Sequence, residues 1–212
     1  MLKVNEIYVS IQGESSHTGL PCIFIRLTGC NLRCTWCDTA HAFYAGKNFT
    51  LEEILKKVET FKVPLVEITG GEPLMQEDVY PLMNSLLEKG YQVMLETGGS
   101  LPIDRVPEKI IKILDIKCPG SGEELKNHLE NLKLLSPHDE IKFVLLDRSD
   151  YEWSRDLMQK LKLPSSAQIL FSPVYDKLNL KDLSKWILED QLPVRLQTQL
   201  HKVIWSKNTI GV

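Results

Sequence analysis

Apolar runs typical of β-strands alternate with amphipathic helical stretches along most of this chain, and that alternation restricts the fold more than any other feature. It predicts a strand at 22–27, a helix at 50–61 with Thr50 and Glu53 as a capping box, and a strand at 65–68. The pattern continues with helices at 79–89, 123–135, 149–161 and 180–189, and with strands at 91–95, 110–116, 140–145, 168–171 and 194–197. Strands joined through helices run parallel in one sheet, so we expect an α/β fold.

The number of strand–helix units predicts how far the sheet closes. A closed barrel of eight units takes about 250 residues, whereas this chain has 212 residues and offers six or seven units, some of them short. We therefore expect a partial, open βα barrel with about six parallel strands. Because no repeat, linker or low-complexity stretch divides the sequence, residues 1–212 are expected to form a single domain.

Composition argues against several classes of protein. Apolar residues make up 43% and charged residues 25% of the chain, and the net charge of -3 lacks the basic surplus of a general nucleic-acid binder. The N-terminal residues mix charged and apolar side chains, unlike a signal peptide, and no apolar run approaches the length of a membrane span. We expect a cytoplasmic protein that binds neither nucleic acid nor membrane.

Three cysteines lie within eight residues, at Cys30, Cys34 and Cys37, in a predicted loop at 28–39. This C-x3-C-x2-C spacing lets three thiolates converge on one small inorganic centre. A cubane iron–sulfur cluster normally takes four cysteine ligands, so three ligands would leave one iron open to a cofactor or substrate. The spacing therefore favours a 4Fe–4S cluster with an open iron.

Two other interpretations of these cysteines stay open. A structural zinc site needs four ligands, and it would have to recruit His17 or His41 because no fourth cysteine is near. Alternatively, the thiols are simply buried structural cysteines. The odd total of five cysteines, with Cys22 and Cys118 as free thiols, argues against a disulfide framework.

Further motifs follow predicted strands directly. A Gly-Gly-Glu-Pro sequence lies at 70–73, Glu-Thr-Gly-Gly at 96–99 and Asp-Ile-Lys at 115–117. The C-terminal ends of parallel strands lie along one rim, where α/β proteins place their chemistry. These motifs and the cysteine loop should therefore share one site.

The cysteine spacing, the aromatic residue before the last cysteine and the Gly-Gly-Glu-Pro motif resemble the radical S-adenosylmethionine (SAM) superfamily. The resemblance implies that the open iron binds the methionine end of SAM, and that an electron from the cluster cleaves SAM to a 5′-deoxyadenosyl radical. It also implies SAM contacts at Trp36, Cys37, Asp38, Gly70, Gly71, Glu72, Gly99, Asp115, Ile116, Lys117, Ser172, Pro173, Val174 and Tyr175.

A finer resemblance covers nearly the whole chain. Ile-Gln-Gly-Glu at 11–14, Cys-Asp-Thr at 37–39, Glu-Thr-Gly-Gly at 96–99 and Gln-Thr-Gln-Leu-His-Lys at 197–202 are similar to motifs of the 7-carboxy-7-deazaguanine synthase family. The resemblance implies ring contraction of 6-carboxy-5,6,7,8-tetrahydropterin to 7-carboxy-7-deazaguanine with loss of ammonia, in queuosine and 7-deazapurine biosynthesis.

The same resemblance assigns substrate and metal contacts. Arg26 would bind the substrate carboxylate through its guanidinium fork, although a surface ion pair is the alternative. Thr39 would bind Mg²⁺ together with substrate oxygens, although the residue alone suggests a loop cap. His201, at the end of the last predicted strand, would touch the substrate unless it is a packed histidine. The complete set of expected substrate contacts is Ile11, Gln12, Gly13, Glu14, Arg26, Thr97 and His201.

The resemblance also implies a homodimer and an external one-electron reductant of the flavodoxin or ferredoxin type. Two alternative functions remain at this point. A glycyl-radical-enzyme activating protein would share the cluster spacing but should lack the motifs at 12–14 and 199–202. A non-enzymatic zinc or iron–sulfur protein would leave the Gly-Gly-Glu-Pro motif and the strand–helix alternation unexplained.

Overall fold

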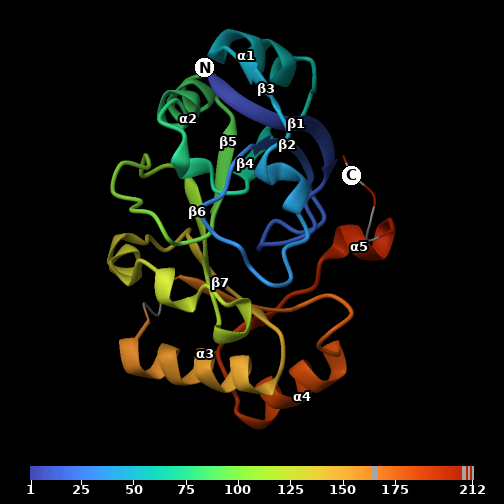
Figure 1. Cartoon of the computed structure of the whole chain (residues 1–212), viewed down its shortest axis with the longest axis vertical. Coiled ribbons are helices and arrows are strands. Elements are labelled where there is room, and N and C mark those ends of the chain that lie inside the picture. Colours follow the sequence, from blue (N-terminus) through green and yellow to red (C-terminus); the bar gives the residue numbers. More distant parts are fainter. Residues whose placement is uncertain (164–166, 207–208, 210, 212) are drawn as a thin grey trace.

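The computed structural model describes residues 1–163, 167–206, 209 and 211, and one nine-stranded sheet runs through it (Figure 1). The strands are β1 (Leu2–Ile11), β2 (Pro21–Leu27), β3 (Lys47–Phe49), β4 (Leu65–Gly70), β5 (Gln92–Thr97), β6 (Ile111–Ile116), β7 (Glu140–Leu145), β8 (Gln168–Pro173) and β9 (Arg195–Leu196). The α-helices are α1 (Leu51–Glu59), α2 (Val79–Glu88), α3 (Arg148–Leu161), α4 (Leu180–Glu189) and α5 (Leu200–Ile204). Short 3₁₀ helices lie at Ala40–Phe43, Pro73–Met75, Pro119–Ser121, Glu124–Lys126 and Leu129–Leu134.

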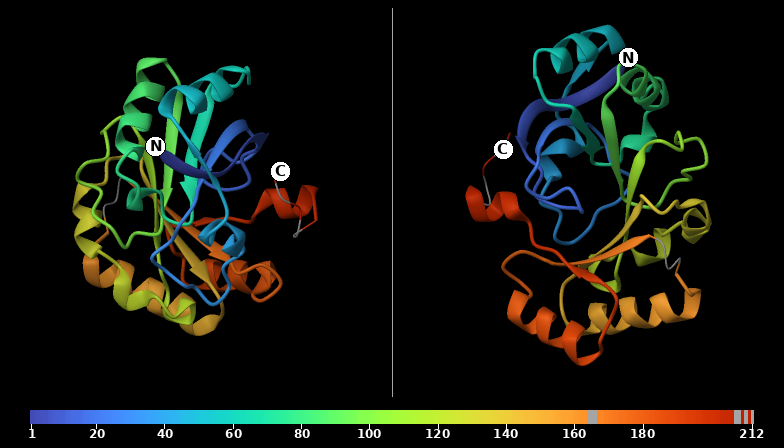
Figure 2. Two further views of the ribbon diagram at one scale, coloured as in Figure 1. Left: turned by 45° about the horizontal axis from the view of Figure 1, so that its top comes forward. Right: turned by 180° about the vertical axis from the view of Figure 1, so that it is seen from behind.

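The sheet is an open barrel. Its strand order is β3-β1-β2-β4-β5-β6-β7-β8-β9, and every neighbouring pair from β2 to β9 is parallel. Strand β1 is antiparallel to both β2 and β3, and the two end strands β3 and β9 do not pair with each other. Helices α1 to α4 lie on the outside of the curved sheet (Figure 2). The expected partial βα barrel is confirmed, with the short β9 added to the six longer parallel strands.

Alternation along the strands separates the inside of the barrel into two layers. Side chains at Cys22, Phe24, Leu65, Met94, Ile111 and Ile113 form an apolar cluster on the inner face. Two residues further along the same strands, on the same face, the side chains become polar or charged. They are Arg26, Glu67, Glu96 and Asp115. The apolar layer therefore closes one end of the barrel, and the polar layer opens at the C-terminal ends of the strands.

Local chemistry explains where the helices begin. Thr50 Oγ1 accepts a hydrogen bond from the Glu53 backbone N–H at 3.2 Å, and Glu53 Oε2 accepts from the Thr50 N–H at 2.7 Å. This is the capping box expected from the sequence. Asp147 begins α3 in a similar way, accepting from the N–H groups of Ser149 and Asp150. None of the helices in the described part of the chain is long and apolar enough to cross a membrane.

The α-helix expected at 123–135 is wrong, because two 3₁₀ segments replace it. Asn127 hydrogen-bonds both backbone groups of Lys117 at 2.9 Å, and Asn131 bonds the backbone of Leu101 and Ile103. These contacts to neighbouring loops hold the chain out of a regular helix.

The two ends of the chain also differ from expectation. The long strand β1 was not predicted, although its alternating apolar residues Leu2 and Val4 are buried. The last strand is shorter than the predicted 194–197, covering Arg195–Leu196, and His201 lies on α5 rather than at a strand end. The C-terminal segment, residues 197–206, leaves β9 and crosses to the N-terminal part of the sheet (Figure 1).

Candidate active site

A cavity of about 760 Å³ opens at the C-terminal ends of the parallel strands. Its size is typical of a small-molecule site. The cysteine loop lines one wall, and the N-terminal loop (residues 12–20) and the C-terminal segment line another. The floor is formed by charged residues on the inner face of the strands, Glu67, Glu96, Asp115 and Lys142. Residues far apart in the sequence thus meet in one place.

The three cysteines of the C-x3-C-x2-C motif all line this cavity. The Leu32 N–H points at Cys30 Sγ at 3.4 Å, and Thr39 Oγ1 lies 3.7 Å from Cys37 Sγ. Burial raises the pKa of Cys30 and Cys34. No three His, Cys, Asp or Glu side chains of the described residues form a ready-made ion site. Three thiols on one loop facing a cavity, with a backbone N–H toward sulfur, fit a 4Fe–4S cluster.

The Gly-Gly-Glu-Pro segment packs directly against the cysteine loop. A Cβ atom at Gly71 would lie 2.3 Å from the carbonyl oxygen of Gly29 and 2.6 Å from Cys30 Cβ, so only glycine allows this approach. Glu72 is fully buried and accepts hydrogen bonds from Thr97 Oγ1 at 2.9 Å and from the Gly98 N–H at 2.8 Å. Glu72 therefore links the end of β4 to the end of β5.

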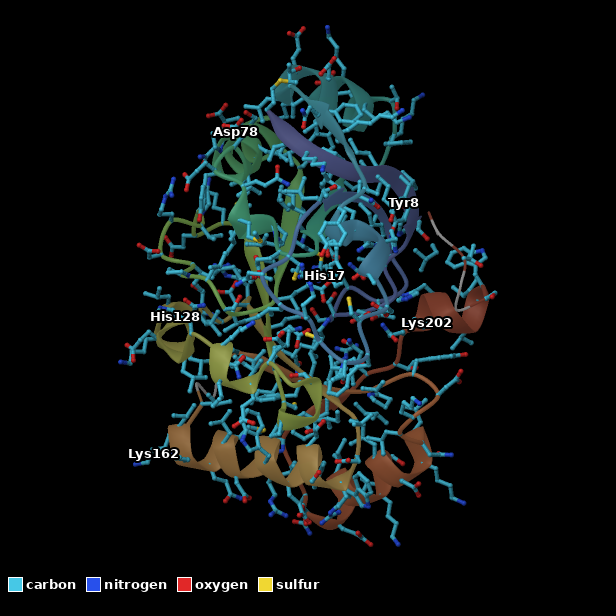
Figure 3. All side chains as sticks on the ribbon, viewed as in Figure 1. Tyr8, His17, Asp78, His128, Lys162 and Lys202 are labelled. Atoms are coloured by element: carbon cyan, nitrogen blue, oxygen red, sulfur yellow. The ribbon has the colours of Figure 1, made fainter. Side chains whose placement is uncertain are left out.

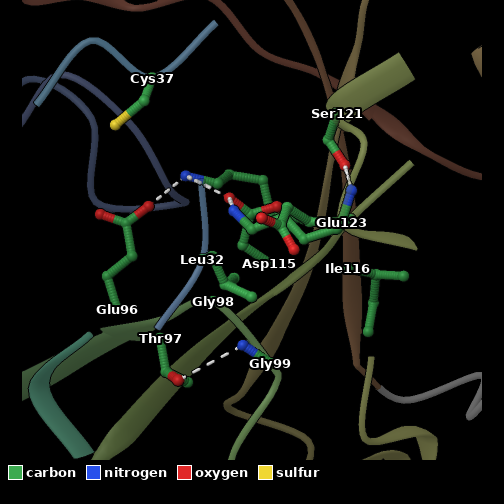
Figure 4. Close-up of polar contacts among 12 residues, drawn as sticks. Leu32, Cys37, Glu96, Thr97, Gly98, Gly99, Asp115, Ile116, Ser121 and Glu123 are labelled. Carbon is green, nitrogen blue, oxygen red and sulfur yellow. Dashed lines mark hydrogen bonds and ion pairs between the residues drawn. The ribbon is translucent and has the colours of Figure 1, made fainter. Parts of the chain in front are cut away.

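Charged side chains dominate the floor. Lys142 Nζ lies 3.0 Å from Glu14 Oε2 and 3.9 Å from Asp115 Oδ2, and it also donates to Glu96 Oε1. Lys117 Nζ donates to Asp115 Oδ2 at 2.7 Å. Burial alone would lower the pKa of Lys142, but its three carboxylates raise that pKa well above its usual value. Figure 4 shows the Glu96 and Asp115 carboxylates on opposite sides of this network, and Cys37 lies above Glu96 in this view.

A fourth carboxylate lies deeper in the barrel. Glu67 is 4% exposed and accepts a hydrogen bond from Gln12 Nε2. Burial and the nearby carboxylates of Glu96 and Glu14 raise the pKa of Glu67 to about 8. Gln12 is fixed in turn, because its Oε1 accepts from the Glu14 N–H at 3.0 Å.

Arg26 projects from β2 into the cavity and is held by two neighbours. Its Nε donates to Glu6 Oε1 at 2.7 Å, and Nη2 donates to Tyr8 Oη at 3.0 Å. His41 lies 3.7 Å from the same Glu6 oxygen. The guanidinium is thus mostly buried in an ion pair, and its Nη1 has no hydrogen-bond partner among the described residues.

The C-terminal segment closes against the N-terminal loop. The Leu200 N–H donates to the Gly13 carbonyl at 2.9 Å, and a Cβ at Gly13 would lie 2.2 Å from His201 Nδ1. Lys202 Nζ pairs with Asp38 Oδ2 at 2.6 Å, which ties α5 to the cysteine loop. In Figure 3, Tyr8 and Lys202 come from opposite ends of the chain and lie on the same side of the molecule.

Most of the residues predicted from the sequence line this cavity. They are Ile11, Gln12, Gly13, Glu14, Arg26, Cys30, Cys34, Trp36, Cys37, Asp38, Thr39, Gly70, Gly71, Thr97, Asp115, Lys117, Ser172, Val174, Tyr175 and His201. Four do not line it: Glu72, Gly99, Ile116 and Pro173. Their ligand roles stay predictions, and Glu72 already has a full set of protein donors.

The sequence analysis missed several residues of the site. The cavity is also lined by Glu6, Tyr8, Glu67, Thr69, Glu96, Lys142, Gln199 and Lys202. A charged residue inside an apolar strand was the available signal for two of them, Glu67 in β4 and Lys142 in β7. Glu96, Gln199 and Lys202 lie within the motifs at 96–99 and 197–202, although no contact was assigned to them, and the remaining three depend on which segments meet in space.

Comparison with known proteins gives consistent results. Residues 24–162 match the radical SAM superfamily. A 7-carboxy-7-deazaguanine synthase of Koribacter versatilis is 47% identical, covering 100% of this chain and 100% of that protein. Another, of Chlorobaculum tepidum, is 43% identical and covers 100% of this chain and 97% of that protein. The crystal structure of QueE from Escherichia coli aligns with a TM-score of 0.78 at 25% identity, over 94% of each chain.

An open βα barrel whose strand ends face a three-cysteine loop is the architecture of radical SAM enzymes, and the chain belongs to that superfamily. Its cofactors are therefore a 4Fe–4S cluster and SAM, with Mg²⁺ in addition in the QueE type. Within the superfamily the chain belongs to the family of 7-carboxy-7-deazaguanine synthases, because relatives of that name match it over its full length. The activating-enzyme and zinc-protein alternatives are not favoured.

Proposed function

We propose that this chain converts 6-carboxy-5,6,7,8-tetrahydropterin to 7-carboxy-7-deazaguanine with loss of ammonia, a step of queuosine and 7-deazapurine biosynthesis. One observation carries the proposal: a single cavity joins three cysteine thiols to an arginine and a carboxylate-rich floor. The arginine suits a ligand carboxylate, and the carboxylates of the floor suit ligand N–H groups. The pterin has one carboxylate and many N–H groups. The full-length relatives are named for the same product.

The cofactors would bind at the cysteine wall. Cys30, Cys34 and Cys37 would hold the cluster, and the bound cluster with SAM would supply the 5′-deoxyadenosyl radical. Gly70 and Gly71 let the end of β4 pack against the backbone of Leu27 and Gly29, which places this segment beside the cysteine loop. The remaining residues proposed to contact SAM are Trp36, Asp38, Glu72, Gly99, Asp115, Ile116, Lys117, Ser172, Pro173, Val174 and Tyr175.

Arg26 is proposed to bind the substrate carboxylate. Glu6 and Tyr8 already hold Nε and Nη2, so the guanidinium has a fixed orientation before the ligand arrives. Burial favours such a charge-assisted contact because water does not compete for it. The alternative of a purely structural ion pair would leave Nη1 without a function.

The pterin ring is proposed to contact the N-terminal loop, Thr97 and His201. Ile11 and Gly13 offer backbone groups, and Gln12 and Glu14 offer side chains whose orientations are fixed by protein hydrogen bonds. The α5 helix places His201 against Gly13, so the C-terminal segment covers this side of the ligand.

Mg²⁺ is proposed to bind Thr39 together with substrate oxygens. Mg²⁺ needs few protein ligands when waters and substrate complete its shell. The Thr39 hydroxyl has only a 3.7 Å contact with Cys37 Sγ, whereas the neighbouring Asp38 carboxylate is occupied by Lys202 and Gln199. The metal would orient the substrate and polarise its carboxylate.

The enzyme is further proposed to act as a cytoplasmic homodimer that receives electrons from a flavodoxin or ferredoxin. The reason is the chemistry: reductive cleavage of SAM needs one external electron for each radical formed. The homodimer and the cytoplasmic location rest on the resemblance to the family.

The test is anaerobic incubation of the reconstituted enzyme with the carboxytetrahydropterin, SAM, Mg²⁺ and a chemical reductant, followed by mass detection of the product. We expect the deazaguanine from the wild type. Arg26→Ala should keep its cluster but lose about ten- to a hundredfold in kcat/KM, the equivalent of one charge-assisted hydrogen bond. Absence of the deazaguanine from an enzyme that holds its cluster and cleaves SAM would refute the proposed function.

A further inference from the structure

Lys142 has no part in the function described so far, yet it lies where three carboxylates meet. Its side chain projects from β7 into the barrel and is 5% exposed. Nζ contacts Glu14 at 3.0 Å, Asp115 at 3.9 Å and Glu96. These carboxylates belong to the N-terminal loop, β6 and β5, so one ammonium group joins three separate segments.

The ammonium group is already committed to protein partners. It carries three protons and no acceptor, and it donates hydrogen bonds to Glu14 and Glu96, with Asp115 at 3.9 Å. A ligand that approached the lysine would compete with these carboxylates. Lys142 therefore acts on a ligand through the carboxylates that it holds.

Lys142 is also the cation that balances this part of the floor. Lys117, the other lysine that lines the cavity floor beside Asp115, is committed to that carboxylate at 2.7 Å. Glu14 and Glu96 thus share the charge of Lys142. Without it, these two largely buried carboxylates would repel each other and move apart or take up a proton.

The two carboxylates are held to different extents. Glu14 uses both oxygens, because Oε2 contacts Lys142 and Oε1 accepts from Gln199 Nε2 at 2.9 Å. Glu96 uses Oε1 for Lys142, while Oε2 has a long 3.4 Å contact from Thr69 Oγ1. The Glu96 side chain is 26% exposed to the cavity. Its Oε2 is therefore the acceptor that remains for a ligand N–H group.

We propose that Lys142 is a positioning residue that holds Glu96 as a hydrogen-bond acceptor for the N–H groups of the reduced pterin, and fixes Glu14 and the N-terminal loop by the same contact. This inference rests on the proposed function, which supplies a ligand rich in N–H donors. It assigns the lysine to substrate affinity and not to SAM binding, since it reaches Asp115 only at 3.9 Å while Lys117 holds that residue.

The experiment compares Lys142→Met, Lys142→Gln and Lys142→Arg in the cluster-loaded enzyme. Pterin affinity is measured by anaerobic calorimetry with SAM present and no reductant, so that no turnover occurs. SAM affinity, iron content and thermal stability are measured on the same samples. Lys112→Met is the matched control: Lys112 is also buried, pairs with Asp139 at 3.1 Å, and does not line the cavity.

We expect Lys142→Met and Lys142→Gln to weaken pterin binding about ten- to a hundredfold, the loss of a charge-assisted contact. SAM affinity and iron content should stay at wild-type values, and Lys142→Arg should recover most of the pterin affinity. Lys112→Met should lower thermal stability without changing pterin affinity. The Gln variant keeps a polar group in the floor, so it tests the idea even if the Met variant does not fold.

Two results would overturn the inference. One is wild-type pterin affinity in a folded, cluster-loaded Lys142→Gln or Lys142→Met enzyme. The other is an equal loss of affinity in Lys112→Met, because a general effect of removing a buried charge would then explain the data. If the wild type makes no deazaguanine, the proposed function fails and this inference falls with it. If it makes product while the Lys142 variants bind normally, only the inference fails.

Discussion

Asp38 and Thr39 are neighbours in sequence, but the structure gives their oxygens different surroundings. Asp38 is bonded by Lys202 at 2.6 Å and by Gln199 at 3.2 Å, so its carboxylate joins the cysteine loop to the C-terminal segment. Among the described residues, the nearest partner of Thr39 Oγ1 is Cys37 Sγ at 3.7 Å. A carboxylate is the better Mg²⁺ ligand in general, yet here it is already neutralised. The free hydroxyl is therefore the group that a metal ion can use without breaking an ion pair.

This difference predicts how the metal response changes. Thr39→Ala should raise the Mg²⁺ concentration for half-maximal activity at least about tenfold, because the metal loses a protein ligand. Asp38→Asn should keep the wild-type Mg²⁺ response and lower thermal stability. Thr35→Ala serves as the control from the same loop, because Thr35 Oγ1 donates to the Gly120 carbonyl and is not placed at the metal. A shifted Mg²⁺ titration in Asp38→Asn but not in Thr39→Ala would reverse the assignment.

The raised pKa of the buried Glu67 carboxyl should make the free energy of unfolding depend on pH. Its pKa in the folded protein, about 8, lies above the ordinary value for a glutamate, so folding favours the protonated form. The stability that this gives is fully present below the ordinary pKa and is lost as the pH rises through about 8. Besides Glu14 and Glu96, the charged or titratable groups that face it are Lys142, Tyr8 and Cys22.

Glu67→Gln removes this titration while keeping an acceptor for Gln12. Relative to this variant, the wild type should lose up to about 1.4 kcal/mol of unfolding free energy per pH unit between those two pKa values. Urea unfolding at pH 5, 7 and 9 measures the difference. Glu52→Gln on the exposed face of α1 should follow the wild type at each pH. A constant difference between wild type and Glu67→Gln from pH 5 to 9 would contradict the prediction.

At the scale of elements, the sequence was most informative where a segment's own residues decide its structure. The capping box at Thr50 and the apolar runs of β4 to β8 are local features, and they appear in the structure as predicted. The segment at 123–135 failed because Asn127 and Asn131 bond to backbone groups elsewhere in the fold. Helical periodicity contains no information on such contacts.

The same distinction applies to the site. Motifs that follow strands placed the cysteines and the glycines on one rim, as the C-terminal ends of parallel strands require, and the family resemblance added Arg26. Glu96 lies in the motif at 96–99 that was placed on this rim, but its contact with Lys142 was missed because it depends on the inner face of the barrel and on partners across three strands. The position of α5 was missed for the same reason, since its contact with Gly13 joins opposite ends of the chain.

Asn131 tests the explanation for the 3₁₀ segments. Its side chain is 1% exposed, donates to the Leu101 carbonyl at 2.8 Å and accepts from the Ile103 N–H at 3.2 Å. Asn131→Ala would leave the buried Ile103 N–H and the partly buried Leu101 carbonyl without partners, which should cost about 1–3 kcal/mol for the buried group and less for the other. Asn127 is matched in residue type but more exposed, so Asn127→Ala should cost less. Equal unfolding free energies for wild type and Asn131→Ala would refute the explanation.

At the scale of the whole molecule, the main hydrophobic core is shared between the two halves of the chain. The core cluster runs continuously from Leu2 in β1 to Ile187 in α4. Charged contacts add to it, because Glu14 near the N-terminus pairs with Lys142 in β7. The C-terminal segment then returns to the N-terminal loop. If either half, β1 to β6 or β7 to β9 with α3 and α4, unfolded alone, it would expose the part of the core that the other half contributes. The chain should therefore behave as one cooperative unit.

This predicts a single unfolding transition, although the chain exceeds the size at which one transition is usual. Trp153 and Trp186 lie in α3 and α4, so the fluorescence of a Trp36→Phe/Trp205→Phe enzyme reports on the C-terminal half, and the cluster absorbance reports on the cysteine loop in the N-terminal half. In anaerobic urea titrations, both signals should change at the same midpoint as the circular dichroism. Trp186→Phe identifies which tryptophan carries the fluorescence change.

If α3 and α4 formed a separate domain with β7 to β9, the tryptophan signal would shift to another urea concentration while the cluster stayed intact. In the described residues, the two halves of the sheet are joined only by the hydrogen bonds between β6 and β7. Breaking them also opens the shared core, so neither half keeps its packing when the other unfolds. We therefore expect the barrel to open as a whole and the midpoints to coincide.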